Sequence, residues 1–208
     1  MLVSEIINHV KYGDLSNLGV TKNLVSTDTA KAQEAENQLI SYINLGLIEL
    51  YKKFNISTKA EIVVTNSMVS TYQLRNNNIA KILNVYDSSG YELKFQEMVY
   101  EDDYDIKEVG YLTYLLKNPK DEELAFVYKA MPETVYNPSD EVVLPKVMLE
   151  AMVNYIGQRA YAAIGGNRQQ DQQLYFNKFT ESCKILENEG FFKGNDLLSK
   201  NVLSKGFV

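Results

Sequence analysis

The sequence predicts an α+β protein: a helical bundle of long helices with an inserted β-rich subdomain and an extended C-terminal arm. Apolar residues recur at steps of three and four over 28–54, 143–165 and 170–189, the spacing that places them on one face of a helix. Between 60 and 138 the spacing becomes two, and short segments rich in β-branched and aromatic residues indicate strands. After Gly190 the chain stays apolar without a regular period, which favours an arm over a further helix.

These patterns divide the chain into three parts. We assign 1–59 together with 139–190 to the helical core, 60–138 to the inserted subdomain, and 191–208 to an arm that docks on another protein. A chain of 208 residues with 45% hydrophobic content can bury a core of its own. No signal peptide, membrane-spanning run or disulfide is expected, because no sustained apolar run is found and the chain holds a single cysteine. We therefore expect synthesis in the cytoplasm.

The N-terminal part reads as a short helix followed by a long one. Residues 1–12 carry an apolar pattern of about three helical turns, and 13–19 interrupt it with two glycines and turn-forming residues. Residues 26–28 (Ser-Thr-Asp) offer N-caps for a helix that runs to Phe54. Its apolar stripe consists of Ala32, Ala35, Leu39, Ile43, Gly46, Leu50 and Phe54.

Two β-hairpins are predicted in the insertion. Residues 79–86 and 91–95 flank the turn Asp-Ser-Ser-Gly at 87–90, which predicts the first hairpin. The second is expected to pair 111–116 with 124–130 across a turn that contains a proline.

The stretch EDDYDIKEVG (101–110) between these hairpins has no period and reads as a surface loop. It holds the one dense group of carboxylates in the chain: Glu101, Asp102, Asp103 and Asp105. Calcium loops need a different spacing of ligands, glycine and closing glutamate, so a solvated acidic loop is favoured over a metal site. A loop at the wall or rim of a DNA channel is a third reading, because negative charge does not grip a passing polyanion.

The helix that begins near Pro145 is apolar over most of its circumference. Proline suits the first turn, where its missing N–H removes no helical hydrogen bond. A narrow polar stripe is formed by Lys146, Glu150, Asn154 and Gln158. One apolar face is formed by Leu149, Val153, Ile156, Ala160 and Ile164, and a second by Met148, Met152 and Tyr155.

A helix with two apolar faces is normally covered on two sides. The second face, Met148, Met152 and Tyr155, is therefore a candidate contact between neighbouring subunits. A central helix within a monomeric bundle explains the pattern equally well.

The last helix and two interior glycines complete the predicted core. Phe176, Phe179, Cys183 and Leu186 share one face of the last helix. Gly190 stands where a glycine commonly ends a helix. Gly46 and Gly157 each cost roughly 1 kcal/mol inside a helix relative to alanine. Close approach of another helix would justify them, so we place both at helix crossings.

Few residues suggest chemistry, and we predict neither an enzyme nor a cofactor. His9 lies in the N-terminal pattern without a nucleophile signature, so a surface histidine is favoured. Cys183 falls on an apolar stripe and reads as a small core residue. A net charge of −6, with lysine and arginine scattered singly, disfavours tight non-specific DNA binding.

The order of long helix, β-rich insertion, proline-led helix and final helix resembles the head–tail adaptor (connector) proteins of tailed bacteriophages. The segments that carry the resemblance are LISYINLGLIELYKKFN (39–55), IAKILNVYDSSGYELKF (79–95), EVVLPKVMLEAMVNYIGQRAYAAIGG (141–166) and YFNKFTES (175–182). It covers most of 28–190. Residues 1–27 depart from the family as an additional N-terminal segment, and the insertion is long with an acidic loop.

The resemblance implies a structural virion protein of the neck, made in the host bacterial cytoplasm. It implies a ring of identical subunits, usually twelve, beneath the portal, which extends the DNA channel without sequence-specific binding and offers a platform to tail or neck proteins. It also implies that the arm holds the portal, through Phe191, Phe192, Leu197, Leu198, Val202, Leu203, Phe207 and Val208. An arm folded back on its own helices is the alternative.

Two other functions stay open from the sequence. One is a neck or tail-completion protein lying lower in the tail, and the other is a monomeric protein-binding module that uses the β-rich insertion as a ligand surface. Convergent polar residues at a helix N-terminus or strand end would favour a ligand site, and none is evident.

Overall fold

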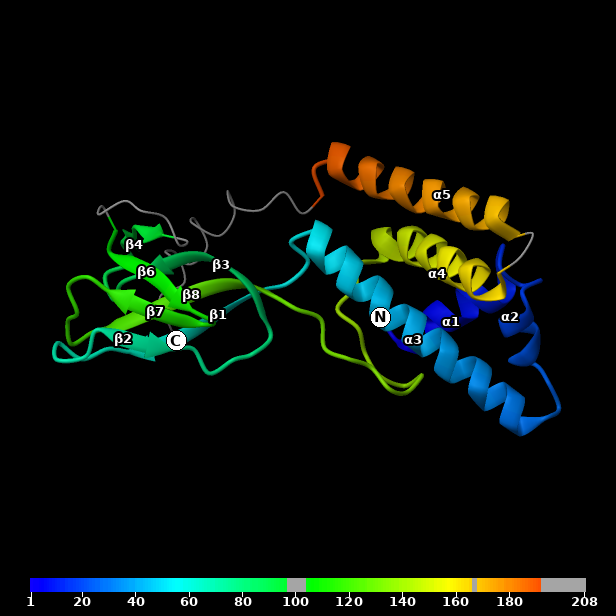
Figure 1. The fold of residues 1–208 in the computed structure, drawn as a ribbon, viewed down its shortest axis with the longest axis horizontal. Coiled ribbons are helices and arrows are strands. Elements are labelled where there is room, and N and C mark those ends of the chain that lie inside the picture. Colours follow the sequence, from blue (N-terminus) through cyan, green and yellow to red (C-terminus); the bar gives the residue numbers. More distant parts are fainter. Residues whose placement is uncertain (97–103, 166–167, 192–208) are drawn as a thin grey trace. The chain divides into compact units, whose positions relative to one another are not determined.

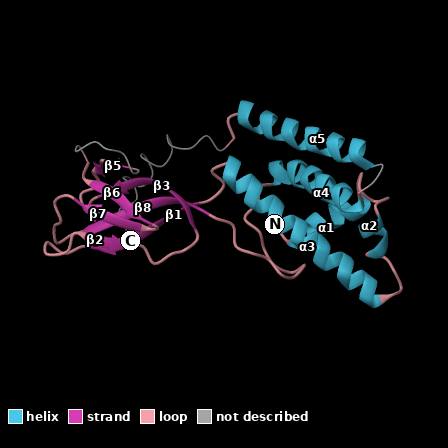
Figure 2. Ribbon diagram, in the orientation of Figure 1, coloured by secondary structure: helices cyan, strands magenta, loops and turns pink. Residues whose placement is uncertain are grey.

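The computed structural model describes residues 1–96, 104–165 and 168–191, and it confirms the α+β class (Figures 1 and 2). The described residues form two compact units. A helical unit combines 1–56 with 132–191, and a β unit holds 57–96 with 104–131.

The helical unit contains six helical segments, which we describe in chain order. They are α1 (Val3–Tyr12), α2 (Gly19–Asn23), α3 (Thr29–Lys53), the 3₁₀ turn η1 (Lys146–Met148), α4 (Leu149–Ile164) and α5 (Gln169–Asn188). Helix α3 has 25 residues and α5 has 20, whereas α2 has only 5. Helix α4 lies between α3 and α5 (Figure 1).

Helix α3 begins where the sequence predicted. The Asp28 carboxylate accepts hydrogen bonds from the amides of Ala30 (3.1 Å) and Lys31 (3.3 Å). Because the first amides of a helix have no partner within it, this cap stabilises the N-terminus by about 1 kcal/mol. The predicted stripe is buried from Ala35 to Phe54, and Ile40, Leu47 and Tyr51 widen it.

The N-terminal segment is part of the helical core. Val3, Ile6 and Leu15 are fully buried in the same cluster as α3 and α4. The amide of Val3 donates to the Asp140 carbonyl (3.0 Å), which ties this segment to the chain that leads into α4. Buried Thr21 donates its hydroxyl to the Leu15 carbonyl (2.7 Å) and so closes the turn before α2. Residues 1–27 are thus structural and do not form a separate appendage.

Two side chains of α3 hold the segment that returns from the β unit. The Asn44 amide nitrogen donates to the Val135 carbonyl (2.8 Å), and the Val135 amide donates to the Asn44 side-chain oxygen (3.0 Å). Further along α3, the Tyr51 hydroxyl donates to the Val143 carbonyl (2.8 Å). Burial, assisted by the negative charge of Glu133, raises the pKa of Tyr51 to about 12, so this hydroxyl stays a donor at neutral pH.

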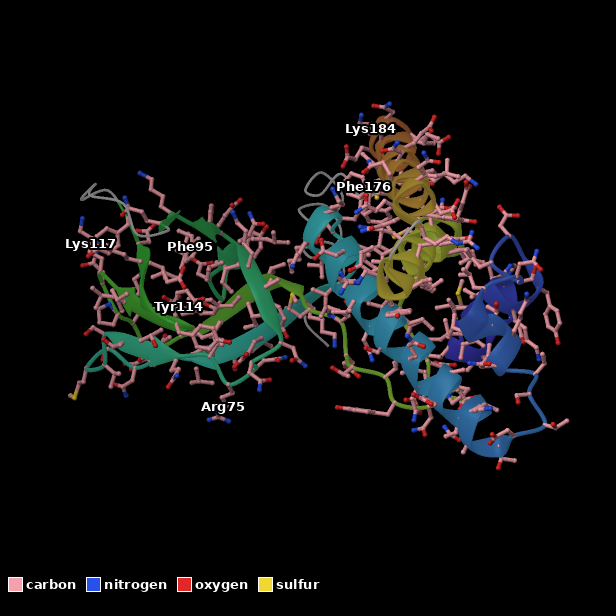
Figure 3. All side chains as sticks on the ribbon, turned by 45° about the vertical axis from the view of Figure 1, so that its right-hand side comes forward. Arg75, Phe95, Tyr114, Lys117, Phe176 and Lys184 are labelled. Atoms are coloured by element: carbon pink, nitrogen blue, oxygen red, sulfur yellow. The ribbon has the colours of Figure 1, made fainter. Side chains whose placement is uncertain are left out.

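The β unit is built from two four-stranded sheets. Its strands are β1 (Thr58–Val64), β2 (Thr71–Gln73), β3 (Ile79–Tyr86), β4 (Glu92–Leu93), β5 (Phe95–Gln96), β6 (Ile106–Gly110), β7 (Thr113–Leu116) and β8 (Glu123–Ala130). The strand orders are β1-β8-β3-β4 and β2-β7-β6-β5. Aromatic side chains pack in the interior (Figure 3). The centre of the Tyr114 ring lies 5.2 Å from the centre of the Phe126 ring and 5.9 Å from that of the Phe95 ring.

The first predicted hairpin is confirmed over Glu92–Leu93, whereas Phe95 at the end of its predicted second strand belongs to β5 in the other sheet. Val85 of β3 lies opposite Leu93 of β4 in antiparallel register. In the turn, the Asp87 carboxylate accepts from the amides of Ser89 and Tyr91, both at 2.9 Å. Gly90 has a φ of 82°, a conformation that residues with a Cβ rarely adopt.

The second predicted hairpin is wrong. Strand β7 pairs with β6 and β2 in one sheet, whereas β8 lies between β1 and β3 in the other. The predicted turn instead carries the chain from one sheet to the other, because both strands have an apolar face that packs into the same interior. Part of the predicted acidic loop is also strand: Ile106–Gly110 forms β6, which turns into β7 at Tyr111-Leu112.

The last helix differs from the prediction in one position of its buried face. Tyr175 is 7% exposed and joins Phe179, Cys183 and Leu186, whereas Phe176 is 45% exposed on the surface of α5 (Figure 3). The predicted helix end at Gly190 is confirmed: Gly190 has a φ of 75°, and the Phe191 amide donates to the Leu186 carbonyl (3.1 Å). This is the pattern of a Schellman motif.

Both interior glycines lie at helix contacts, as predicted, but at different ones. A Cβ on Gly46 of α3 would come within 2.6 Å of the Met152 sulfur of α4. A Cβ on Gly157 of α4 would come within 2.6 Å of the Tyr175 ring of α5. The ring cannot yield as a methionine side chain can, so Gly157 is the stricter requirement.

We expect Gly157→Ala to lower the free energy of unfolding by about 1–2 kcal/mol, although alanine is the better helix former. The overlap with Tyr175 should cost about 1–3 kcal/mol, which exceeds the gain of roughly 1 kcal/mol in helix propensity. Urea unfolding followed by circular dichroism measures this. Gly19→Ala is the matched control, because a Cβ at that position would meet nothing within 4 Å. Equal stability of both variants would contradict the close-packing explanation.

Candidate interaction surfaces

The described residues offer surfaces for protein contacts. Within 1–96, 104–165 and 168–191, no group of three or more His, Cys, Asp and Glu residues is placed to hold a metal ion. His9 is exposed on α1, and Cys183 is 2% exposed in the helical core, as predicted for both. Burial raises the pKa of the Cys183 thiol to about 11, against the opposing effect of the nearby Lys53 ammonium, so the thiolate nucleophile is scarce at neutral pH. Among the described helices, none is long and apolar enough to cross a membrane.

A hollow of about 540 Å³ lies on the helical unit between α1, α4 and α5. We call it the α1–α4–α5 hollow. It is lined by His9, Gly13, Asp14, Leu149, Glu150, Val153, Asn154, Lys178, Glu181, Ser182 and Ile185. Its large apolar residues are Leu149, Val153 and Ile185, and its charged residues are Asp14, Glu150, Lys178 and Glu181.

Two polar contacts fix the walls of this hollow. The Lys178 ammonium lies 3.9 Å from the Asp14 carboxylate and 5.1 Å from the centre of the Tyr175 ring, which links α5 to the turn after α1. Asn154 of α4 donates to the Ser182 hydroxyl of α5 (3.2 Å). Asn154, a member of the predicted polar stripe, is only 6% exposed. It is a buried polar side chain with a partner, as the packing of α5 on α4 requires.

The exposed side of α5 carries half-exposed apolar residues, one of which, Ile185, lines the hollow. Leu174 is 49% exposed and Ile185 is 50% exposed. They are eleven positions apart, so they lie on nearly the same face of the helix. This face was missed from the sequence, because the apolar pattern of α4 is the more continuous one.

The predicted inter-subunit face of α4 is wrong. Met148 and Met152 are 0% exposed and Tyr155 is 8% exposed, so all three lie inside the helical unit. Met152 and Tyr155 lie against Gly46 of α3, and the Tyr155 ring is 5.3 Å from Phe179 of α5. The physical reason is that α3 and α5 together supply the cover that the prediction assigned to a second subunit.

Most of the other predicted site residues lie outside the described residues. These are Glu101, Asp102 and Asp103 of the acidic loop, and Phe192, Leu197, Leu198, Val202, Leu203, Phe207 and Val208 of the arm. Two are described. Asp105 precedes β6 and its carboxylate accepts from the Lys94 amide (2.9 Å), while Phe191 is 39% exposed after the end of α5.

The β unit presents a second surface on the β1-β8-β3-β4 sheet, on the side away from the interior. Ile62, Ala125 and Tyr86 lie in register across three strands there, and Ala60 and Val127 form the neighbouring row. Ile62 is 51% exposed and Val64 is 71% exposed. Apolar side chains on the solvent side of an antiparallel sheet indicate a contact surface.

The chain matches a protein family over most of its length. Residues 11–190 match the model of the family described as SU10 adaptor protein. The matched range includes α2 to α5 and all described strands of the β unit. No curated protein matches the sequence.

We expect Met148→Glu to destabilise the folded subunit, because it places an unpaired carboxylate in an apolar interior. The free energy of unfolding should fall by about 3–5 kcal/mol, as for other uncompensated buried charges. Urea unfolding measures this, with Met148→Leu as the matched control at a cost below about 1.5 kcal/mol. A Met148→Glu protein that folds normally and differs only in oligomeric mass would restore the α4 face as a subunit contact.

Proposed function

The chain belongs to the SU10 adaptor protein family, and on this premise we propose that it forms a ring of twelve copies beneath the portal of a tailed phage. As a phage adaptor it is a structural virion component that associates with other head or tail proteins. In the proposed ring it joins the head to the tail and extends the channel through which DNA passes. Its partners are further copies of itself, the portal, and tail or neck proteins.

The single observation that carries this proposal is the family match over residues 11–190. A match of this extent includes both units, so it does not rest on a shared motif or on one subdomain. A net charge of −6 agrees with a channel that DNA crosses without being held, because like charges repel. The loop at 101–105 is proposed to line or rim that channel.

We propose that neighbouring copies meet at the α1–α4–α5 hollow. A ring needs a heterologous contact, in which one surface of each subunit meets a different surface of the next. The hollow is lined by the apolar residues Leu149, Val153 and Ile185 together with the Asp14–Lys178 pair. Leu174 extends the apolar surface along α5. This location replaces the buried methionine face of α4.

The arm at 191–208 is proposed to attach the ring to the portal. Its apolar residues would lose contact with water in that complex, and this gain has to exceed about 1–2 kcal/mol per ordered residue of backbone entropy. The Schellman motif at Gly190 ends α5, so the helix stops before the arm begins.

Native mass spectrometry should find a closed oligomer, either of the protein alone or after mixing with portal. The double variant Leu174→Glu/Ile185→Glu should reduce it to monomer, because two carboxylates on this face oppose apolar contact. Both side chains are about half exposed, so the fold should persist by circular dichroism. Val109→Glu on β6 is the matched control, with 48% exposure in the β unit. A persistent monomer with and without portal would favour the monomeric binding module.

Deleting 192–208 should abolish attachment to portal-bearing heads while the truncated protein still folds. This deletion keeps Phe191 and therefore the hydrogen bond that completes the end of α5. Co-sedimentation with heads measures attachment, and thermal unfolding measures the fold. Undiminished attachment of the truncated protein would exclude the arm as the portal contact without bearing on the ring itself.

A further inference from the structure

Strand β8 is apolar on both of its faces, which is unusual for a strand of a two-layer sandwich. Leu124, Phe126 and Tyr128 point into the interior between the sheets. Ala125 and Val127 point the other way, and they are 5% and 4% exposed. Strands with apolar residues on both sides are typical of sheets that are covered on both sides. The sequence of β8 therefore indicates that the outer face of this sheet has a cover.

The outer face has a defined apolar centre. Tyr86, Ala125 and Val127 form a buried cluster separate from the interior of the β unit. Ile62 of β1 lies in register with Ala125 and is 51% exposed, and Val64 beyond it is 71% exposed. The apolar surface thus continues from the buried centre to side chains that are open to contact.

The segment 192–208 has a matching composition. It contains seven large apolar residues: Phe192, Leu197, Leu198, Val202, Leu203, Phe207 and Val208. It also contains three lysines and one aspartate, so its net charge is positive. On the outer face, Glu123 lies opposite Val64 and Glu92 lies opposite Tyr86, whereas Lys129 lies opposite Lys81, so this face carries charges of both signs. The segment and the face therefore match in apolar character.

Covalent geometry brings this segment within reach of the sheet. Lys53 at the end of α3 lies close enough to Cys183, in the last two turns of α5, for its ammonium to influence the pKa of the thiol. From Lys53 the chain enters β1 at Thr58, at most about 19 Å away along the backbone. A segment of seventeen residues spans up to roughly 55–60 Å when extended. It can therefore cross to the outer face and run along it.

We propose that residues 192–208 of the same chain cover the outer face of the β1-β8-β3-β4 sheet before the protein assembles. Attachment to the same chain gives the segment an effective concentration on the order of millimolar, so a modest apolar contact holds it. The contact keeps an apolar segment from associating non-specifically. It goes beyond the proposed ring, and the portal would take up the segment only by displacing it from the sheet.

A single introduced tryptophan tests this on the full-length protein without portal. The chain has no tryptophan, so Leu203→Trp provides one indole that reports on the segment. We expect its fluorescence maximum at a shorter wavelength than that of an exposed indole. Adding Ile62→Asp should move the maximum to the exposed value, because the carboxylate interrupts the apolar row. Adding Val109→Asp, a site of similar exposure on the other sheet, should leave it unchanged.

Three results would overturn the proposal. If the indole is exposed in all of the variants, the segment is not docked. If the indole is buried but its fluorescence maximum does not change with Ile62→Asp, the segment docks elsewhere. A shift that appears only at high protein concentration would assign the sheet to the segment of a second copy. If circular dichroism shows that Ile62→Asp unfolds the β unit, Val64→Asp at a more exposed position replaces it. Because the experiment contains no portal, a negative result would not contradict the proposed ring.

Discussion

The helical unit depends on the need to cover α4. Most of its side chains are apolar, and a helix of this composition is stable only when other elements remove most of its circumference from water. Helix α3 covers one side across Gly46, and α5 covers another across Gly157, where the absence of a side chain lets the Tyr175 ring approach. The segment before α3 closes the remaining side, with Val3 and Ile6 in the same buried cluster. The positions of the other helices follow from this requirement.

The interruption of the helical unit by the β unit creates a second requirement, which polar contacts meet. The chain leaves after α3 and returns some seventy residues later, and it has to resume at a fixed register for α4 to fill its place. Asn44 binds the backbone of Val135 through both its donor and its acceptor, a geometry that only one register satisfies. The Tyr51 hydroxyl holds the same returning segment at a second point, by donating a hydrogen bond to the Val143 carbonyl. Apolar packing alone would tolerate a shift along the helix axis, whereas these directional bonds do not.

Sequence patterns predicted the parts of the fold that local physics determines. The start of α3 at Asp28, the turn at Gly90 and the end of α5 at Gly190 follow from capping and from backbone conformations that particular residues favour. It was harder to predict which elements pair with one another. Strand β8 carries no signal that distinguishes pairing with β7 from pairing with β1, because both partners are amphipathic and only the closed sandwich decides. Likewise, the burial of Met148 and Met152 could not be separated from a subunit contact, since periodicity shows that a face is covered but not by which chain.

The candidate surfaces were less accessible to prediction than the core. Leu174 and Ile185 each stand next to residues of the buried face of α5 in the sequence, and only the packing of α5 on α4 shows that they are left half exposed. The apolar character of the outer face of the β1-β8-β3-β4 sheet was predictable from the sequence, because Ala125 and Val127 make the centre of β8 an unbroken apolar run.

The discontinuous path of the helical unit has a consequence for the order of events during synthesis. The described strands of the β unit lie between Thr58 and Ala130, so all of them are translated before α4. Helices α1 to α3 are made first, yet the helix they have to cover does not exist until residues 149–164 emerge. The nascent chain therefore carries an exposed apolar surface throughout the translation of the β unit. The helical unit, although it begins the chain, is the last part of the subunit that can close.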